Sequence, residues 1–342
     1  MSDELIPVGS QTLTKKGDDK KKKVEVEPFK LTDVPIVMRK KGWEVAARLQ
    51  DIWFAGESFI ISGEEKGGRP IKSYLEKNPP EVKFNAKVVT EKETLATADW
   101  LFSFPIMVDK LEELKKVLNT ANAKKEICNY LKREKMIDFE GDNKIIQEDI
   151  EKLKEKFPGK DAKSAEGLTT AINDMIKEIP GKLKKVKHPW SNKKSIEEFH
   201  YYWQFQQLKI DSREKKDAFA DFDGLDAALY KFTLNAGIAE VETQPIIKGR
   251  EIYGYTVKIP RVVIYGRDIF DFSDDGMFSQ YLGCWNKEDV KVFNVIGYTI
   301  VNNKHYCEWR KKNKKGGDMI VFTGAKMFDT SKVLNFTIMP GQ

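Results

Sequence analysis

Histidine and cysteine are scarce in this chain, and their scarcity limits the chemistry that it can perform. Only three histidines occur in 342 residues, so general acid–base catalysis by histidine has few candidates. The three cysteines, Cys128, Cys284 and Cys307, stand far apart and form no CxxC pair. This arrangement argues against a structural zinc site and is typical of reduced thiols in a cytoplasmic protein.

Long apolar segments and nucleotide-binding loops are missing as well. The nearest candidate for a membrane span, residues 101–108, is much shorter than the roughly 18 residues required and contains Pro105. The first residues have no apolar core of the kind that a secretory signal needs, so we expect neither a transmembrane segment nor classical secretion. The sequence also contains no Walker-type or GxGxxG loop, no GxSxG elbow and no HExxH helix. These absences exclude the nucleotide, serine hydrolase and zinc sites that such motifs build.

Neither sign of charge dominates. Lysine and arginine total 59 and aspartate and glutamate 53, which gives a net charge of +6. The two signs are interleaved along most of the chain, a pattern typical of a solvated surface and not of a concentrated nucleic-acid-binding face. We therefore expect no specific nucleic-acid partner. Hydrophobic residues at 40% and aromatic residues at 11% are sufficient for a real core.

Composition shifts divide the chain into four parts. Residues 1–30 contain the lysine-rich run 15–23 and are expected to be a disordered basic leader, or alternatively a segment that loads the protein onto a partner. Residues 31–108 are predicted to form an N-terminal α+β part and residues 109–182 a helical insertion. Residues 183–342 are predicted to form a C-terminal α+β part with an antiparallel sheet. The predicted fold class is therefore α+β.

Helical periodicity is clearest in the N-terminal and middle regions. Aromatic and alanine residues recur at helical spacing from Trp43 to Phe54, after a break at Gly42. Leucines and isoleucines repeat in the same way within 109–180, where glycine and proline punctuate the pattern. We expect several short helices there, packed as a hairpin and not as a coiled coil.

Strand periodicity dominates after residue 234. The expected strands are 81–90, 246–259, 261–272, 290–301, 318–323 and 332–339, with 100–108 as a strand or a buried loop. Pro260 separates two of these strands. Short helices are expected at 195–206, 223–232 and 305–312. Consecutive strands joined by tight turns predict an antiparallel sheet.

The densest polar cluster lies within residues 265–275, where Asp268 and Asp271 stand three positions apart in one predicted strand. Side chains alternate between the two faces of a strand, so a kink or a strand end is needed to bring both carboxylates together. Gly266 could supply a bulge. Two interpretations stay open. The aspartates form a pair for acid–base catalysis or for a divalent cation, or they cap backbone donors at a strand end.

A second cluster runs from Trp309 to Asp318 and combines basic residues with a Gly-Gly pair. Backbone N–H groups in such a turn can form an anion-binding nest, whereas the alternative is a charged hairpin tip. If the sheet brought Arg310 and Asp318 to the same edge as the two aspartates, they would form a cleft that handles phosphate. Arg267 or Arg310 would then stabilise the anion, because guanidinium groups pair with phosphate.

Five stretches of the chain resemble a bacterial domain-of-unknown-function family. They are 38–47 (MRKKGWEVAA), 220–226 (ADFDGLD), 265–272 (YGRDIFDF), 282–286 (LGCWN) and 315–318 (KGGD). The resemblance covers most of the chain outside the leader and the Lys/Glu-rich helices. Members of that family are similar to proteins encoded near type VI secretion and polymorphic toxin systems. The resemblance therefore implies a bacterial effector or an effector-associated protein.

The chain also resembles colicin M-type hydrolases, which cleave the lipid-linked peptidoglycan precursor. Their Asp-x-aromatic-Asp motif is matched by Asp268, Phe270 and Asp271. In those enzymes the motif continues to a His-Arg pair, whereas residues 277–280 contain no histidine here and the next one downstream is His305. This likeness therefore extends to the acidic pair alone.

The leading hypothesis is a toxin effector that is delivered by a contractile, type VI-like secretion system and acts as a hydrolase. Asp268 and Asp271 would be acid–base or metal-binding carboxylates, completed by Arg267, Arg310 and Asp318. The residues do not specify a metal or another cofactor. The alternative is a non-catalytic adaptor or structural protein of the secretion machinery. The expected partners are a secretion-system component, a chaperone or an immunity protein. The protein would be made in the bacterial cytoplasm and exported into a target cell without a classical signal.

Overall fold

The structure is a computed structural model that describes residues 28–67, 84–159, 162–273 and 279–341. Most of the predicted leader and the start of the predicted 81–90 strand lie outside these ranges. Helices and strands are both abundant, which confirms the α+β fold class. Within the described ranges, no helix combines the length and the apolarity needed to cross a membrane.

The chain divides into two units whose segments alternate along the sequence. Unit 1 comprises Met1–Lys110, Leu208–Leu234 and Tyr265–Ala325, and unit 2 comprises Leu111–Gln207, Asn235–Ile264 and Lys326–Gln342. Four of the five boundaries between these segments fall inside α7 (Pro105–Val117), β3 (Gln204–Asp211), β4 (Lys231–Lys248) and β5 (Glu251–Phe270). These four elements therefore contribute residues to both units.

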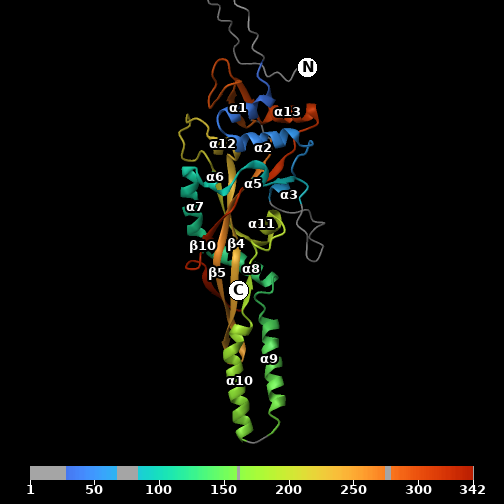
Figure 1. Ribbon diagram of the computed structural model, residues 1–342, viewed down its shortest axis with the longest axis vertical. Helices are drawn as coiled ribbons and strands as arrows, with labels where there is room; N and C mark the ends of the chain where they lie inside the picture. The colour runs from blue at the N-terminus through green and yellow to red at the C-terminus, as the bar shows by residue number, and fades with distance from the viewer. Residues whose placement is uncertain (1–27, 68–83, 160–161, 274–278, 342) are drawn as a thin grey trace, which may run out of the picture. The chain divides into compact units, whose positions relative to one another are not determined.

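Unit 1 contains many short helices (Figure 1). They are η1 (Leu31–Asp33), α1 (Val34–Lys40), α2 (Glu44–Ala55), α3 (Gly63–Lys66), α5 (Glu91–Thr94), α6 (Ala98–Phe102), α12 (Gly224–Ala228) and α13 (Asn303–Asn313). The helix α2 packs against α1, α5 and α12. It buries Val45, Leu49 and Trp53, because these residues recur on one face of the helix. Gly42, with a φ of +76°, makes the turn between α1 and α2, which confirms the break expected there.

The strands of unit 1 belong to two sheets. In the first sheet, β9 (Met319–Phe322) pairs antiparallel with the last residues of β5 and parallel with β1 (Lys87–Val89). The second sheet is antiparallel and has the order β7 (Val290–Lys291), β6 (Tyr281–Trp285), β8 (Thr299–Asn302). The C-terminal region therefore contains the predicted antiparallel sheet, whereas the larger sheet is mixed because β1 and β9 run parallel.

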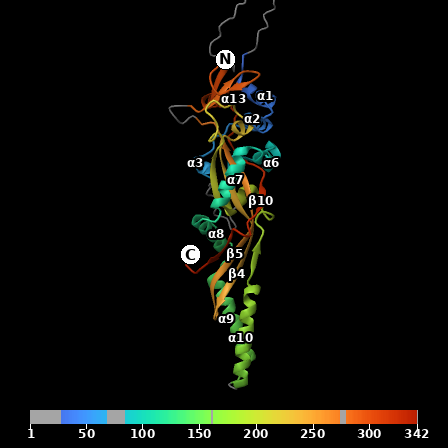
Figure 2. The same cartoon turned by 90° about the vertical axis from the view of Figure 1, so that its left-hand side faces the viewer.

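Unit 2 combines helices with the greater part of β4 and β5. Its other elements are α8 (Ala121–Arg133), α9 (Phe139–Lys156), α10 (Ala162–Lys182), α11 (Ile196–Trp203), β2 (Lys185–Lys187), β10 (Lys326–Asp329) and β11 (Asn335–Ile338). The helices α9 and α10 lie side by side in both Figure 1 and Figure 2. This arrangement confirms the helical hairpin expected in the middle of the chain.

Pro260 lies inside β5 and does not separate two strands as predicted. The strand β11 pairs with Tyr255–Lys258 and the strand β10 with Arg261–Ile264, so the proline stands where β5 changes from one partner to the other. A proline has no N–H to donate, but its carbonyl accepts a hydrogen bond from the Thr330 N–H at 2.8 Å. The strand therefore continues through a residue that usually ends one.

Three further predictions of secondary structure are wrong. The predicted strand 246–259 is divided by a turn at Gly249, with a φ of +62°, which separates β4 from β5. Residues 100–108 belong mainly to α6 and to the start of α7, because Thr97 caps α6 and Pro105 is the first residue of α7, a position that proline suits. Residues 290–301 do not form one strand. The strands β7 and β8 take only the two ends of that range, and a turn at Gly297, with a φ of +87°, interrupts it.

Candidate functional site

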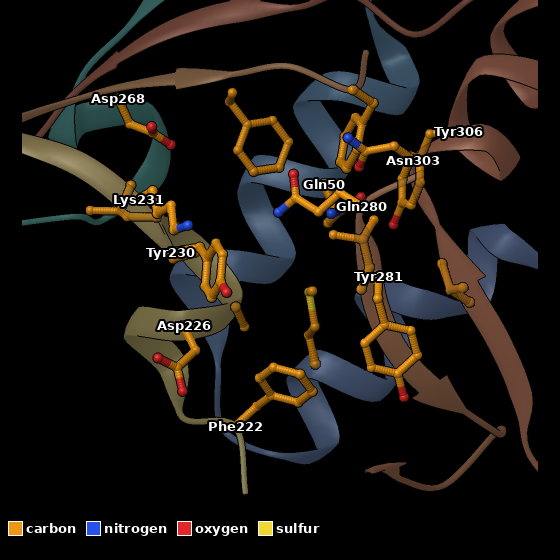
Figure 3. Close-up of a pocket in the computed structure, with 18 of the residues that line it drawn as sticks. Gln50, Phe222, Asp226, Tyr230, Lys231, Asp268, Gln280, Tyr281, Asn303 and Tyr306 are labelled. Carbon is orange, nitrogen blue, oxygen red and sulfur yellow. The ribbon is translucent and has the colours of Figure 1, made fainter. Parts of the chain in front are cut away.

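A cavity of about 390 Å³ lies in unit 1, and every residue that lines it belongs to that unit. Its walls come from α1, α2, the segment around α12, the end of β5 and the sheet that contains β6 and β8 (Figure 3). Most of the lining is apolar or aromatic. A concave, mainly apolar site with a few polar groups is the usual form of a small-molecule site. We therefore refer to this cavity as the Asp268 pocket and consider its polar groups in turn.

Asp268 is a buried acid in the wall of the pocket. It lies on β5 opposite Val321 of β9, and only 8% of the residue is exposed. Figure 3 shows its carboxyl group pointing toward the pocket. Burial raises the pKa of Asp268 well above its ordinary value, and the charge of Asp271 raises it further, while the Ile269 N–H and Arg267 lower it. Among the described residues Asp268 forms no ion pair. Its surroundings therefore favour the protonated acid.

Asp271 also lines the pocket but has a different environment. Its Oδ2 accepts a hydrogen bond from the Nζ of Lys66, which lies at 2.5 Å and supplies a counter-charge. The sequence thus correctly places two carboxylates in one cavity, because β5 ends at Phe270 and Asp271 lies just beyond the last residue of the strand. Two carboxyl groups in contrasting surroundings are the arrangement in which one acts as an acid and the other as a base.

Arg267 is absent from the lining of the pocket. Neighbouring residues of a strand point to opposite faces, so Arg267 lies on the face of β5 opposite to that of Asp268. Its Nη2 donates a hydrogen bond to the carbonyl oxygen of Glu65 at 3.2 Å. Burial lowers the pKa of Arg267. The predicted anion stabiliser is therefore not in a position to contact a ligand in the pocket.

Arg310 and Asp318 form a buried ion pair with each other outside the pocket lining. The exposed fractions of the two residues are 4% and 1%. Asp318 also accepts hydrogen bonds from the indole Nε1 of Trp53 at 3.3 Å and from the backbone N–H of Ile61 at 3.2 Å. Burial raises the pKa of Asp318, while Arg310 and these two donors lower it. Asp318 thus connects Arg310 of α13 with Trp53 of α2, and these contacts hold the two helices together.

The Gly-Gly stretch before Asp318 does not form the predicted anion nest. The Gly316 and Gly317 N–H groups donate to the carbonyl oxygens of Gly56 and Trp53 at 3.0 and 3.1 Å, and the Asp318 N–H donates to the carbonyl of Phe59 at 3.0 Å. These donors are therefore already used within the protein. Gly316, with a φ of +97°, has Trp53 so close that a Cβ atom would lie 2.6 Å from the indole ring. The stretch is a close backbone contact and not a hairpin tip.

Several pocket residues could not be recognised from the sequence. Gln50 from α2, which is 4% exposed, and Asn303 and Tyr306 from α13 all line the cavity. Asn303 Nδ2 donates to the carbonyl of Ser273 at 3.0 Å. The local signal at Gln50 was a polar residue on the buried face of a helix, and such a residue is unusual in a core. That signal marks an unusual residue but does not show that a cavity lies beside it.

A network of charges at the side of the pocket holds the segment before β4. The carboxylate of Asp226 accepts hydrogen bonds from the hydroxyl of Ser212 at 2.6 Å, from Arg213 at 3.2 Å and from Lys216 at 2.7 Å. Asp226 and Arg213 both line the cavity. Because two cations and one hydroxyl satisfy this carboxylate, its role is to fix the wall. In the part of the chain that the structure describes, no cluster of three or more His, Cys, Asp or Glu side chains could hold a metal ion.

The protein thus has an α+β fold, and two aspartates line a pocket in unit 1. The chain belongs to a family of unknown function (DUF6402), whose sequence model matches residues 29–297 and 291–338. No curated protein and no solved structure matches the chain. The expected membership of a family of unknown function is therefore confirmed. Four of the five stretches that carried the resemblance, all except 315–318, contribute residues to the pocket lining.

Proposed function

We propose that this protein is a hydrolase that uses the Asp268 pocket and acts as a bacterial effector. The observation that carries the proposal is the burial of Asp268 in a cavity wall without an ion-pair partner among the described residues. A carboxyl group kept protonated in apolar surroundings is suited to act as a general acid.

In this proposal the two aspartates have separate roles. Asp268 gives its proton to the leaving group of the substrate, and Asp271 accepts a proton from the attacking water. Both residues line the cavity, and the charge of Asp271 raises the pKa of Asp268. Lys66 holds the carboxylate of Asp271 by an ion pair. Arg267, Arg310 and Asp318 have no role in this reaction, because these residues do not line the pocket.

The effector part of the proposal rests on the resemblance to proteins encoded near type VI secretion and toxin systems and on the acidic motif shared with colicin M-type hydrolases. It would make the protein a toxin that is exported by a contractile secretion system into a target cell. Its partners would be a component or chaperone of that system in the producing cell, and an immunity protein that blocks the pocket.

Growth of a bacterial host tests both parts. The full chain is expressed in the cytoplasm and, with an added export signal, in the periplasm, alongside Asp268→Asn and the control Asp174→Asn, which changes an exposed aspartate of α10. We expect the wild type and the control to stop growth in one compartment and Asp268→Asn to permit it. Normal growth of all strains in both compartments would contradict an effector. Equal toxicity of the wild type and Asp268→Asn would contradict the role of Asp268.

The second candidate function is a non-catalytic adaptor or structural protein of the same machinery. The observation that favours it is the hairpin of α9 and α10, whose exposed faces carry lysine and aspartate or glutamate side chains in ion pairs within each helix. Such helices suit contacts with a partner. A stoichiometric complex with a secretion-tube protein or its chaperone that survives the double change Asp268→Asn and Asp271→Asn would favour this function over the hydrolase.

A further inference from the structure

Flat aromatic side chains from separate elements line the Asp268 pocket. Trp43 precedes α2, Phe222 precedes α12 and Tyr230 precedes β4, while Tyr281 and Trp285 belong to β6. Phe222, Tyr230 and Tyr281 surround the cavity in Figure 3. Aromatic rings attract other flat rings, because stacking buries apolar area and suits the charge distribution of both partners. The walls of the pocket therefore favour a flat ligand.

The polar groups of the pocket are few and complementary. Gln50 projects from α2 toward the middle of the pocket (Figure 3). Its side chain forms a hydrogen bond with the Tyr306 hydroxyl, but its Oε1 has no hydrogen-bond donor among the described residues. A buried acceptor without a donor is unfavourable, and a ligand that donates a hydrogen bond to it recovers that loss. The carboxyl group of Asp268, when protonated, offers an O–H donor. The pocket therefore favours a ligand whose edge carries a donor for Gln50 and an acceptor for Asp268.

The charges around the pocket are balanced. Lys66 offsets the charge of Asp271, and Arg213 and Lys216 offset that of Asp226. Lys231, which also lines the cavity, pairs with Asp211 at 3.6 Å. Because each of these cations has an acidic partner, an uncharged ring is favoured in the cavity over a phosphate or a carboxylate.

A flat ring with a donor and an acceptor on one edge is the form of a nucleobase, whereas a sugar fits less well. A sugar carries a hydroxyl on most of its ring carbons, and each buried hydroxyl needs a partner. The lining of this cavity is mainly apolar, and one of its amides, that of Asn303, already donates to the carbonyl of Ser273. Stacking on aromatic side chains also accepts any base.

We propose that the Asp268 pocket binds an uncharged, nucleobase-type heterocycle, with its faces against the aromatic walls and its polar edge on Gln50 and Asp268. This inference rests on the proposed function for its use of the pocket and names the substrate class. The hydrolysed bond would be the N-glycosidic bond that joins such a base to a sugar.

The reaction balances with water as the only co-reactant. The bond between the sugar C1′ and the ring nitrogen breaks, and its electron pair goes to the base. Asp268 transfers its proton to a ring nitrogen of the leaving base. The oxygen of a water molecule bonds to C1′, and the proton that this water releases goes to Asp271. Solvent then exchanges the proton between the two carboxyl groups, which restores the starting state.

Isothermal titration calorimetry of the full chain with adenosine, inosine, cytidine and uridine tests the binding, with N-acetylglucosamine as the sugar probe. We expect at least one nucleoside to bind and the sugar not to. Gln50→Leu removes the unpartnered acceptor at nearly constant volume, and we expect it to weaken binding roughly tenfold. The matched control Gln147→Leu changes an exposed glutamine of α9 in unit 2 and should leave the affinity unchanged.

Phe222→Ala gives a second measurement in case Gln50→Leu does not fold, because Phe222 is only partly buried. Loss of one stacking face should weaken binding by about tenfold. Binding of the sugar probe alone, no binding of any nucleoside, or wild-type affinity in both Gln50→Leu and Phe222→Ala would each overturn the inference.

Release of free base, followed by chromatography, separates this inference from the proposed function. Asp268→Asn keeps an N–H donor where the acid had an O–H, so we expect it to bind the nucleoside and release no base. Binding without any release by the wild type would overturn the hydrolase and leave the nucleobase site intact. Toxicity that depends on Asp268 without nucleoside binding would overturn the nucleobase site and leave the hydrolase intact.

Discussion

Two buried aspartates of unit 1, Asp318 and Asp268, differ in the number of hydrogen-bond donors around them. Asp318 is enclosed by donors, with the guanidinium of Arg310, the indole of Trp53 and a backbone N–H directed at its two oxygens. Asp268 is also deeply buried but faces a cavity, and within the described ranges its carboxyl group accepts a hydrogen bond from the N–H of Ile269 alone. Burial raises the pKa of both residues.

The comparison distinguishes an acid with structural contacts, Asp318, from the acid that we propose to act in the reaction, Asp268. A folded protein normally provides partners for a buried polar group, since leaving it unpaired is costly. Asp318 follows that rule, and Asp268 departs from it at a pocket. A carboxyl group that the fold leaves without a counter-charge is a candidate for function. The sequence placed both residues in one expected site, whereas the structure gives them different surroundings.

The largest effect on stability is expected from removal of the guanidinium group that pairs with Asp318. We expect Arg310→Met to lower the free energy of unfolding by about 3–5 kcal/mol, because it leaves a buried carboxylate without its partner. Urea denaturation followed by circular dichroism measures this loss. The control Lys177→Met removes one side of an exposed pair with Asp174 and should cost no more than about 0.5 kcal/mol. Equal stability of the two variants would mean that the buried pair does not hold the fold.

Removal of the carboxyl group of Asp268 should raise the stability of the fold at neutral pH, whereas Arg310→Met lowers it. The folded protein retains a proton that the unfolded chain releases at a pKa of about 3.9. The unfolded state therefore binds fewer protons, and stability falls as the pH rises from that value through the raised pKa of the folded state. Asp268→Asn lacks this term, so its stability relative to the wild type should rise by up to about 1.4 kcal/mol per pH unit in that window.

Denaturation of the wild type and Asp268→Asn at a series of pH values measures this difference. Parallel curves for the two proteins would show that Asp268 has the same proton affinity in the folded and unfolded states, and the contrast with Asp318 would be lost.

The smallest effect is expected at the ion pair of Asp271. Lys66 and Asp271 are both partly exposed, and pairs of this kind contribute about 0–1 kcal/mol. We expect Lys66→Met to change the stability within that range, as measured by thermal unfolding. A loss as large as that of Arg310→Met would place Asp271 with Asp318 among the structural acids.

The acidic pair could be predicted because its signal is local. Asp268 and Asp271 stand close together at the end of a strand, and the residues of that strand have strong β propensity. The pairing of Arg310 with Asp318 could not be predicted, because it depends on the turn after α13 that brings the chain back toward α2. Gln50 reaches the pocket only through the tertiary arrangement that brings residues of α2, β5 and β6 around one cavity, and no spacing in the sequence encodes that arrangement.

Secondary structure was likewise predicted well where the local signals agree and poorly where they are ambiguous. The helix α13 and the strands β9 and β11 follow predicted ranges closely, because periodicity and capping agree there. The short apolar stretch at 100–108 was ambiguous, since an eight- or nine-residue apolar run suits a helix and a strand alike. The cap at Thr97 and the proline at the start of α7 decide in favour of helices.

The change of partner along β5 has a consequence for solubility. Between Tyr255 and Ile264, β11 and β10 together cover the hydrogen-bonding edge of β5, with Pro260 at their junction. Without these two short strands, β5 would present a long row of free N–H and C=O groups to any other chain with a compatible edge. The strands β10 and β11 therefore protect β5, the longest strand that the structure describes, from pairing with another copy of the chain. Pro260 lies at the point where the two protecting strands meet.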